Sequence, residues 1–578
     1  MKKIIKIILN HKWAIICAVL VGIIIAAPQI YFRFKHKDIY HNIGLGGADE
    51  TAYLSRIQEV RDGHYSTANY VWLEGKDLPY LIPSLSEIIA NFTGEIFGLN
   101  IADTTILNRF IFPACILVII YILLYQLISK KIIALVISIT VLLSTELVNP
   151  RALFNLIFKR LPSSSNFLPF NRLIAPQIHL IFFFGFLLFF WFFIKRQKMV
   201  YKFLSGIVLG LSFYTYPYTW TFLFAFLGCL ILIDICRKNW LEIKSIISIF
   251  SIALVISIPY FVNLWQAMQY PTYYKISLRY GIVGMHMPQA GAIVLILLAI
   301  FLLFFSYDDS KKYYFCLALV LTPLIVLNQQ IITGLVLIPD HYHWYYHKPL
   351  AVIFILIIIF DFIDEKITIN LLKRVSSSGL IIVILSVNFY NAWVVQSLSY
   401  KYRELSTIEF NKNYGILLDW LNDNAKKDEV ALGNVIVSDL ITMYTSLNSA
   451  TSEDGHYTLI ADEEQITERI FLEFRIDGLD EENVKEVFFR DRSTISASIY
   501  GQKYRKQFSE YGDIPDGKIY WLIDQYKNFL TIPIEDILRK YNIKYVIWDT
   551  VKNQNWEVDQ YPFLEEIYQT ERIKIYIL

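Results

Sequence analysis

The chain reads Gly46-Gly47-Ala48-Asp49-Glu50-Thr51-Ala52-Tyr53 shortly after its first long hydrophobic segment, so two adjacent carboxylates follow a stretch of apolar residues. If a helix begins near Asp49, then Tyr53 and Arg56 lie on the same face as Asp49, at spacings of four and seven residues. Two interpretations are open. The face is a polar functional surface, or Asp49 caps the helix and Glu50 occupies a first turn that favours negative charge in any protein.

The composition identifies a membrane protein. Of 578 residues, 55% are hydrophobic and 16% aromatic, which is too apolar for an ordinary soluble protein. The net charge of +2 gives no reason to expect a nucleic-acid partner. The five cysteines lie in or beside apolar runs, with no CxxC spacing and no histidine at metal-ligand spacing, so neither a disulfide framework nor a zinc site is indicated.

Hydropathy predicts about eleven membrane-spanning helices, since each segment approaches the twenty apolar residues that a span needs. Their approximate ranges are 13–31, 106–128, 132–149, 175–194, 201–216, 218–235, 245–262, 290–306, 313–331, 349–363 and 379–396. The first of them is too long for the apolar core of a signal peptide and is interpreted as a retained anchor.

Basic clusters predict the orientation of these spans. They fall on every second connection: Lys2/Lys3/Lys6/Lys12, Lys130/Lys131, Lys195/Arg196/Lys198, Arg237/Lys238, Lys311/Lys312 and Lys373/Arg374. By the positive-inside rule these connections and the N-terminus are cytoplasmic, and the remaining loops lie outside. Low cysteine use and the lack of eukaryotic targeting signals fit the plasma membrane of a prokaryotic cell.

The composition changes near Ser399 to charged and polar, which predicts two domains: a transmembrane domain over 1–398 and an extracytoplasmic mixed α/β domain over 399–578. Within the second, 430–437 is predicted as a buried strand leading into a helix capped by Ser438. A helix over 533–541 precedes a predicted strand over 541–548, and an alternating strand over 572–578 closes the chain.

The first external loop, 32–105, is far longer than a connector requires, and long loops of this kind are usually functional or disordered. It contains two helical patterns, 50–62 and 84–98, with enough aromatic and aliphatic residues to lie on a membrane surface. Such a loop is suited to a lipid-bound substrate.

This loop resembles the first external loop of GT-C superfamily membrane glycosyltransferases, closest to the aminoarabinose and protein mannosyltransferase-like group. The resemblance rests on Asp49-Glu50-x-x-Tyr53, followed by Arg56, Glu59, Gly63 and an aromatic and proline-rich stretch. It implies that Asp49 is the catalytic base with Glu50 beside it, and that the donor is a sugar on a polyprenyl phosphate. The Glu-Lys-Pro-Pro-Leu segment of aminoarabinose transferases is replaced here by Lys76-Asp77-Leu78-Pro79-Tyr80-Leu81-Ile82-Pro83, which leaves subfamily and substrate open.

The chemistry of such a transfer defines further candidates. A carboxylate must accept the acceptor's proton, and cations must stabilise the leaving phosphate. Besides Tyr53 and Arg56, the candidate substrate-binding residues on the external side are Arg172, Arg279, His341, His343, His347 and Lys348. Their alternatives are structural: Arg172 reaching for lipid headgroups, Arg279 solvated in an aromatic loop, and the aromatic residues around the histidines forming an interfacial belt.

No cofactor is indicated. A divalent metal between Asp49 and a histidine suits the ligand types, but the spacing carries no ligand signature. The leading hypothesis is a glycosyltransferase that uses a polyprenyl-phosphate sugar and an extracytoplasmic lipid, glycan or protein acceptor. One alternative is a transporter or flippase of lipid-linked saccharides, but transporters generally bind their cargo with charged residues near the middle of the membrane, and the spans of this chain carry few there. The other alternative is a non-catalytic envelope assembly protein, which would not need eleven spans.

Overall fold

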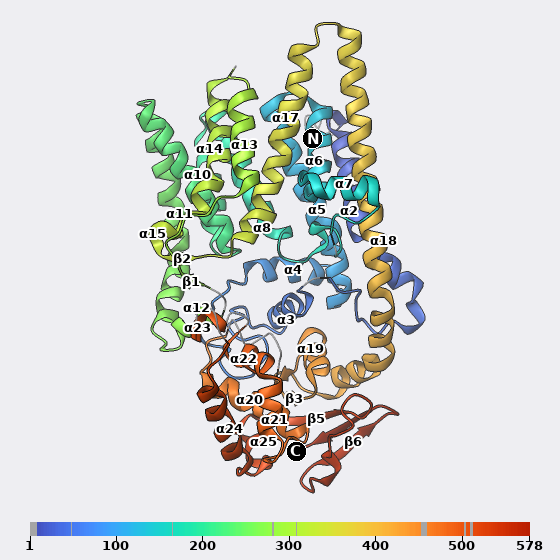
Figure 1. The fold of residues 1–578 in the computed structure, drawn as a ribbon. Coiled ribbons are helices and arrows are strands. Elements are labelled where there is room, and N and C mark those ends of the chain that lie inside the picture. Colours follow the sequence, from blue (N-terminus) through green and yellow to red (C-terminus); the bar gives the residue numbers. More distant parts are fainter. Residues whose placement is uncertain are drawn as a thin grey trace.

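The computed structural model describes residues 9–47, 49–164, 166–279, 282–307, 309–451, 459–501, 504–508 and 513–578. A bundle of long helices forms one half of the molecule and a smaller α/β domain the other, with the helices of the first loop between them (Figure 1). The end of the bundle that faces the α/β domain is called the domain side below, and the opposite end the far side.

Among the described residues, nine helices are long and apolar enough to cross a membrane. They begin with α2 (Lys12–Lys35), α5 (Ile101–Ile128), α6 (Lys131–Ser144, extended by η2, Thr145–Val148), α8 (Gln177–Arg196), α10 (Pro217–Cys236) and α11 (Trp240–Met268). The others are α14 (Ser310–Val326) continued by α15 (Gln330–Thr333), α17 (Lys348–Lys366) preceded by α16 (Pro339–Tyr342) and the π-helical turn η4 (His343–His347), and α18 (Asn370–Asn424).

Two shorter apolar helices, α9 (Met199–Ser212) and α13 (Ala292–Phe304), account for the remaining two of the eleven predicted spans. Each falls short of the eighteen residues of a candidate span. Helix α9 packs closely on α11, because Gly206 and Gly210 lie against Ile252 and Ile256 with no room for a larger side chain. The polytopic helical fold is confirmed, with nine full-length spans and two short helices.

Contacts among the basic connections place them together on the far side. Lys130 lies 3.1 Å from Asp361 at the end of α17, and Lys131 donates to Asn10. Lys311 donates to the carbonyl of Ile194. The predicted clusters that the structure describes therefore share one end of the bundle, opposite the α/β domain, while Lys2, Lys3 and Lys6 lie outside the described residues.

The loops on the domain side carry short helices. The first loop contains η1 (Lys37–Ile39), α3 (Glu50–Arg61) and α4 (Leu85–Glu95), which confirms both predicted helical patterns. Later loops carry α7 (Pro150–Lys159), η3 (Pro169–Asn171) and α12 (Tyr273–Arg279), with the short pair β1 (Val283–Gly284) and β2 (Leu335–Val336). Helices α3 and α4 lie between the bundle and the α/β domain, whereas α7 lies beside the helices of the bundle (Figure 1).

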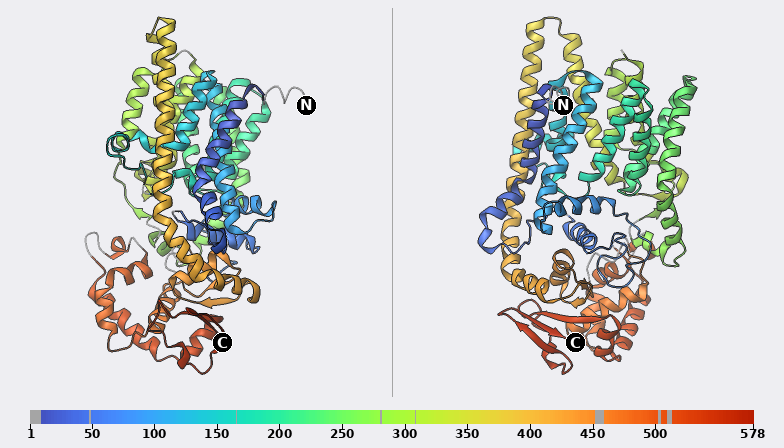
Figure 2. Two further views of the ribbon diagram at one scale, coloured as in Figure 1. Left: turned by 90° about the vertical axis from the view of Figure 1, so that its right-hand side faces the viewer. Right: turned by 180° about the vertical axis from the view of Figure 1, so that it is seen from behind.

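Helix α18 joins the two halves. Its 55 residues are about 80 Å long at 1.5 Å per residue, far more than a bilayer requires. Figure 2 shows it running along the whole bundle and into the α/β domain. The predicted domain boundary at 398/399 falls inside this helix, so the polar second half of α18 continues the membrane span without a break.

The α/β domain is built on a five-stranded mixed sheet of order β4-β3-β5-β7-β6. Its strands are β3 (Val430–Leu432), β4 (Asn448–Ser449), β5 (Ile543–Asp549), β6 (Glu565–Gln569) and β7 (Ile573–Ile577). β3 pairs parallel with β4 and β5, and β7 pairs antiparallel with β5 and β6. The helices are α19 (Val435–Tyr444), α20 (Glu463–Ile476), α21 (Val484–Arg490), α22 (Arg492–Tyr500), α23 (Arg505–Phe508), α24 (Asp516–Leu530), α25 (Ile534–Lys540) and η6 (Val558–Gln560).

One sequence-based prediction in this domain is wrong. The strand expected over 430–437 ends at Leu432, and a helix begins at Val435. Its cap is Asn434, whose side chain accepts the Val437 N–H, and not Ser438. The predicted strands near 541–548 and 572–578 and the helix between 533 and 541 are confirmed as β5, β7 and α25.

Candidate functional site

Asp49 stands at the start of α3 but does not cap it. Its backbone is left-handed, with φ of 54°, and its side chain makes no capping hydrogen bond. The carboxylate instead forms an ion pair with Arg172, with Nη2 2.5 Å from Oδ2. The Asp49 side chain is 59% exposed and that of Arg172 21% exposed, so this pair opens to a surface on the domain side.

Arg172 is held by aromatic side chains from two other elements. Its guanidinium lies 5.3 Å from the ring centroid of Tyr53 and 5.9 Å from that of Tyr345, and it donates to the Tyr345 hydroxyl. Burial opposes the charge, but the neighbouring Tyr53 and Asp49 outweigh it and raise the pKa of Arg172 above its usual range. Arg172 is therefore a fixed cation beside Asp49, and its Nε has no hydrogen-bond partner among the described residues.

Glu50, the neighbouring carboxylate, is largely shielded from solvent. Its Oε1 lies 2.6 Å from Nη2 of Arg109, a side chain that is only 1% exposed, and its Oε2 accepts the N–H of Gly47. Arg109 also donates to Thr105 and to the carbonyl of Asn171. Both oxygens of Glu50 are thus occupied, and this pair ties the start of α3 to α5 and to the segment that carries Arg172.

His341 reaches the same cluster through aromatic contacts. Its ring lies 6.0 Å from that of Tyr345, and its Nδ1 is hydrogen-bonded to the Tyr216 hydroxyl. Tyr216 stacks on His179 with ring centroids 4.2 Å apart. His179 is fully buried, and neither of its ring nitrogens has a hydrogen-bond partner among the described residues.

His343 and His347 face a different space. They line a cavity of about 320 Å³ together with Asp340, Leu327 and the start of α13. His347 is buried, and both of its ring nitrogens lack a hydrogen-bond partner among the described residues. Lys348 is turned away and forms an ion pair with Glu146. The 339–348 segment therefore presents His341 to the Asp49 cluster and His343 and His347 to this second cavity.

Arg56 and Arg279 lie apart from Asp49. Arg56 forms a buried ion pair with Glu87 at 2.9 Å and donates to the carbonyl of Pro83. Arg279 is buried against the α/β domain, where it donates to the carbonyl of Ala461. Burial lowers the pKa of Arg279.

The structure therefore brings Asp49, Tyr53, Arg172 and His341 into one cluster, with Glu50 at its edge. It does not bring Arg56, Arg279, His343, His347 or Lys348 to Asp49. Sequence reasoning did not single out Arg109, His179, Tyr216 or Tyr345. Arg109 and His179 could have been recognised from the sequence, because each lies within an apolar helix, where an ionisable residue is usually functional or paired.

Within the described residues, no group of three or more His, Cys, Asp or Glu side chains is arranged to hold a metal ion. The polar groups at the site are thus the Asp49 carboxylate, the Arg172 guanidinium and the hydroxyls and imidazoles behind them. A carboxylate beside a fixed cation can accept a proton while the cation faces an anionic group.

No protein-family model matches the sequence, and no curated protein matches it. Solved structures do resemble the chain. ArnT from Cupriavidus metallidurans bound to undecaprenyl phosphate is 10% identical, with a TM-score of 0.47 and coverage of 98% of both chains. The Archaeoglobus fulgidus oligosaccharyltransferase in its apo form is 12% identical, with a TM-score of 0.43 and coverage of 93% of this chain and 69% of that one.

Both alignments extend over more than nine-tenths of this chain, at TM-scores below 0.5. At these identities and TM-scores the similarity concerns the general arrangement of the chain. The function has to be inferred from the contacts of the site itself.

Proposed function

We propose that the protein is a membrane glycosyltransferase that transfers a sugar from a polyprenyl-phosphate donor to a hydroxyl-bearing acceptor, with Asp49 as general base. The single observation that supports this most is the pair of Asp49 and Arg172, which is half-open to the surface at the domain side of the bundle. It offers a proton acceptor and a phosphate-binding cation side by side, at the level where a membrane lipid presents its headgroup.

The reaction can be written with these two groups. The acceptor oxygen forms a bond to the anomeric carbon while its proton passes to the Asp49 carboxylate. The bond between the anomeric carbon and the phosphate oxygen breaks, and its electron pair leaves with the polyprenyl phosphate. Arg172 faces that negative charge, and Asp49 returns its proton to solvent through its exposed side.

The donor phosphate and Asp49 compete for Arg172, so binding of the donor changes the hydrogen bonding of the Asp49 carboxylate. The Arg172 guanidinium is paired with Asp49, and an arriving phosphate would take part of its hydrogen bonding. The Asp49 carboxylate is then free to accept a hydrogen bond from the acceptor hydroxyl. Tyr53 and Tyr345 keep Arg172 in place during this exchange, and His341 positions Tyr345.

The other predicted residues take supporting roles in this proposal. Glu50 positions α3 through Arg109, and the separate cavity with His343 and His347 accommodates part of a lipid-linked substrate. Arg56, Arg279 and Lys348 hold loops through their buried pairs and hydrogen bonds. The domain side is proposed to lie outside a prokaryotic plasma membrane, because the basic connections lie at the far side.

Donor turnover in purified full-length protein tests the proposal. A panel of undecaprenyl-phosphate sugars is supplied with extracted envelope lipids and glycans as acceptors, and release of undecaprenyl phosphate is measured. Asp49→Asn is expected to lower turnover by about a hundredfold or more, the usual contribution of a general base. The matched control is Asp38→Asn, at an exposed aspartate in η1, which should leave turnover unchanged.

Undiminished turnover in Asp49→Asn would remove the assignment of the base. If the wild-type chain turns over none of the donors but moves a lipid-linked saccharide across reconstituted vesicles, the protein is a transporter and the proposal fails.

A further inference from the structure

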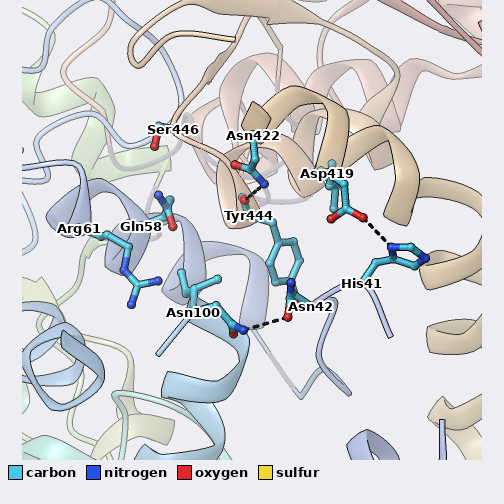
Figure 3. Close-up of a pocket in the computed structure, with 11 residues that line it drawn as sticks. His41, Asn42, Gln58, Arg61, Asn100, Asp419, Asn422, Tyr444 and Ser446 are labelled. Atoms are coloured by element: carbon cyan, nitrogen blue, oxygen red, sulfur yellow. Dashed lines mark hydrogen bonds and ion pairs between the residues drawn. The ribbon is translucent and has the colours of Figure 1, made fainter. Parts of the chain in front are cut away.

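A second cleft lies between the first loop and the α/β domain, apart from both the Asp49 pair and the cavity with His343 and His347. Its volume is about 310 Å³, within the range of small-molecule sites. Figure 3 shows side chains from separate parts of the chain arranged around it, including Asn42, Gln58, Asn100, Asn422 and Tyr444. They come from the segment before α3, from α3, from the start of α5, from α18 and from α19.

Amide side chains dominate the lining, and hydrogen bonds fix one end of each. Asn100 donates to Oδ1 of Asn42, Gln58 donates to Asp62, and Asn422 donates to the backbone carbonyl of Tyr444. These bonds use Oδ1 of Asn42 and the amide nitrogens of Gln58 and Asn422, which leaves the Asn42 amide group and the carbonyl oxygens of Gln58 and Asn422 as the other polar atoms of these side chains at the cleft. Gln58 is only 7% exposed, so its oriented carbonyl belongs to the wall of the cleft.

The charges of the lining nearly cancel. Asp419 is paired with His41 at 2.7 Å, and Arg61 is committed to the carbonyl of Leu99 and to Thr104. No unpaired carboxylate in the lining is left to hold a cation. Arg61 has no carboxylate within ion-pair distance among the described residues, and its Nε and Nη2 donate to the neutral groups of Asn91, Leu99 and Thr104. Oriented amides offer a donor in one place and an acceptor in another, which is what a hydroxyl group requires, and Tyr444 adds an aromatic wall.

We infer that this cleft binds a neutral saccharide, through Asn42, Gln58 and Asn422. Its volume suits one or two sugar units. The cleft also lies close to the Asp49 segment along the chain: Asn42 and Asp49 are at most about 25 Å apart even when that segment is fully extended. Tyr444, on the cleft wall, accepts a hydrogen bond from the N–H of Gly44 within the same segment.

Direct binding to full-length protein tests the inference. The chain is held in lauryldimethylamine oxide, a detergent without a sugar headgroup, and saturation-transfer difference NMR is recorded with methyl α-D-glucoside, D-mannose, D-galactose and N-acetyl-D-glucosamine. Inorganic phosphate serves as a charged probe. At least one saccharide is expected to bind, and phosphate is expected neither to bind in the cleft nor to displace it.

Variants place the bound sugar. Asn422→Leu and Gln58→Leu are each expected to weaken saccharide binding about tenfold, which corresponds to about 1.4 kcal/mol. The matched control is Asn424→Leu, an exposed asparagine on the same helix outside the cleft, which should leave binding unchanged. Asn422 is itself exposed, so its variant keeps the test valid if Gln58→Leu unfolds.

Three results would overturn the inference: no saccharide binds, binding is the same in Asn422→Leu as in the wild type, or phosphate displaces the sugar. Binding in the cleft does not depend on transferase activity. A chain that binds sugars there but turns over no lipid-linked donor keeps this inference and removes the proposed function.

Discussion

Asp49 and Glu50 are neighbours in sequence, but their side chains have opposite surroundings. Asp49 faces outward beside Arg172, whereas Glu50 is enclosed by Arg109 and the N–H of Gly47. An exposed carboxylate can exchange protons with a substrate and with solvent. A carboxylate with both oxygens occupied in a buried pair positions the backbone instead.

Stability separates the two roles. Glu50→Ala leaves the buried Arg109 charge unpaired and is expected to cost about 3 to 5 kcal/mol of unfolding free energy. Asp49→Ala is the matched control: it removes a half-exposed pair and should cost about 1 kcal/mol or less while abolishing transfer. Thermal unfolding in detergent measures both, and Arg109→Leu added to Glu50→Ala should restore part of the loss. Equal destabilisation by the two alanine variants would contradict the assignment of roles.

At the scale of elements, α18 is fastened to the sheet by a buried carboxylate. Asp549 at the end of β5 accepts hydrogen bonds from the Tyr414 hydroxyl at 2.7 Å and from Nη2 of Arg572 at 2.7 Å. The backbone N–H groups of Val551 and Lys552 complete its set. Burial opposes ionisation, but the hydrogen bonds from Arg572 and Tyr414 outweigh it and hold the pKa of Asp549 below its ordinary value of 3.8.

This shift predicts how the junction responds to acid. Because the folded pKa is depressed, the unfolded chain binds more protons near pH 3.8, so the contribution of Asp549 is complete above that pH and is lost as the pH falls through the folded pKa. Thermal unfolding followed from pH 7 to pH 3 should therefore show a loss of stability below about pH 4. Asp549→Asn should be less stable at pH 7 and show a smaller loss in acid.

Asp524→Asn, at an exposed aspartate of α24, is the control and should follow the wild-type curve. An Asp549→Asn variant with the wild-type acid profile would show that Asp549 does not set the stability of the junction.

At the scale of the whole molecule, the first loop is part of the core of the α/β domain. Tyr70, Val71 and Trp72 pack with residues of α20, α24 and β5, and the N–H of Ser449 donates to the carbonyl of Val71 at 2.9 Å. The Arg469 guanidinium lies 4.2 Å from the Trp72 ring centroid. The loop that carries Asp49 is therefore packed against the α/β domain on one side and against the bundle on the other.

Trp72→Ala is expected to cost about 3 to 5 kcal/mol, as for other buried tryptophans, and to expose the first loop to protease. Trp72 is 4% exposed, whereas Trp240 on the membrane-facing α11 is 60% exposed. Trp240→Ala is thus the matched control and should change neither property. Thermal unfolding and limited proteolysis measure the two effects, and an unchanged loop in Trp72→Ala would contradict the coupling.

The sequence predicted what depends on local patterns and missed what depends on distant contacts. Within the described residues, runs of apolar residues located the nine long apolar helices and the two short helices α9 and α13, and the 50–62 and 84–98 periodicities located α3 and α4. The β-branched residues from Val435 to Val437 favoured a strand, but the Asn434 cap began a helix there.

Candidate site residues followed the same division. Asp49 stood out because it follows a membrane span, and its pairing with Arg172 joins segments far apart in the chain. His341 and His343 alternate as in an extended segment, whereas His343 and His347 have a spacing that puts them on one face of a helix, so the sequence left both directions open. The π-helical turn places His343 and His347 in one cavity and His341 in another space. Arg56 and Arg279 carried the right charge, but their pairing with buried groups is visible only in three dimensions.

The most direct measurement is a cryo-EM structure of the full-length chain with undecaprenyl phosphate bound. The phosphate is expected within about 3 Å of the Arg172 guanidinium, with Asp49 beside it and the ion pair between Asp49 and Arg172 loosened. Undecaprenyl phosphate bound elsewhere on the bundle, with the pair of Asp49 and Arg172 unchanged, would contradict the proposal that Arg172 binds the donor phosphate.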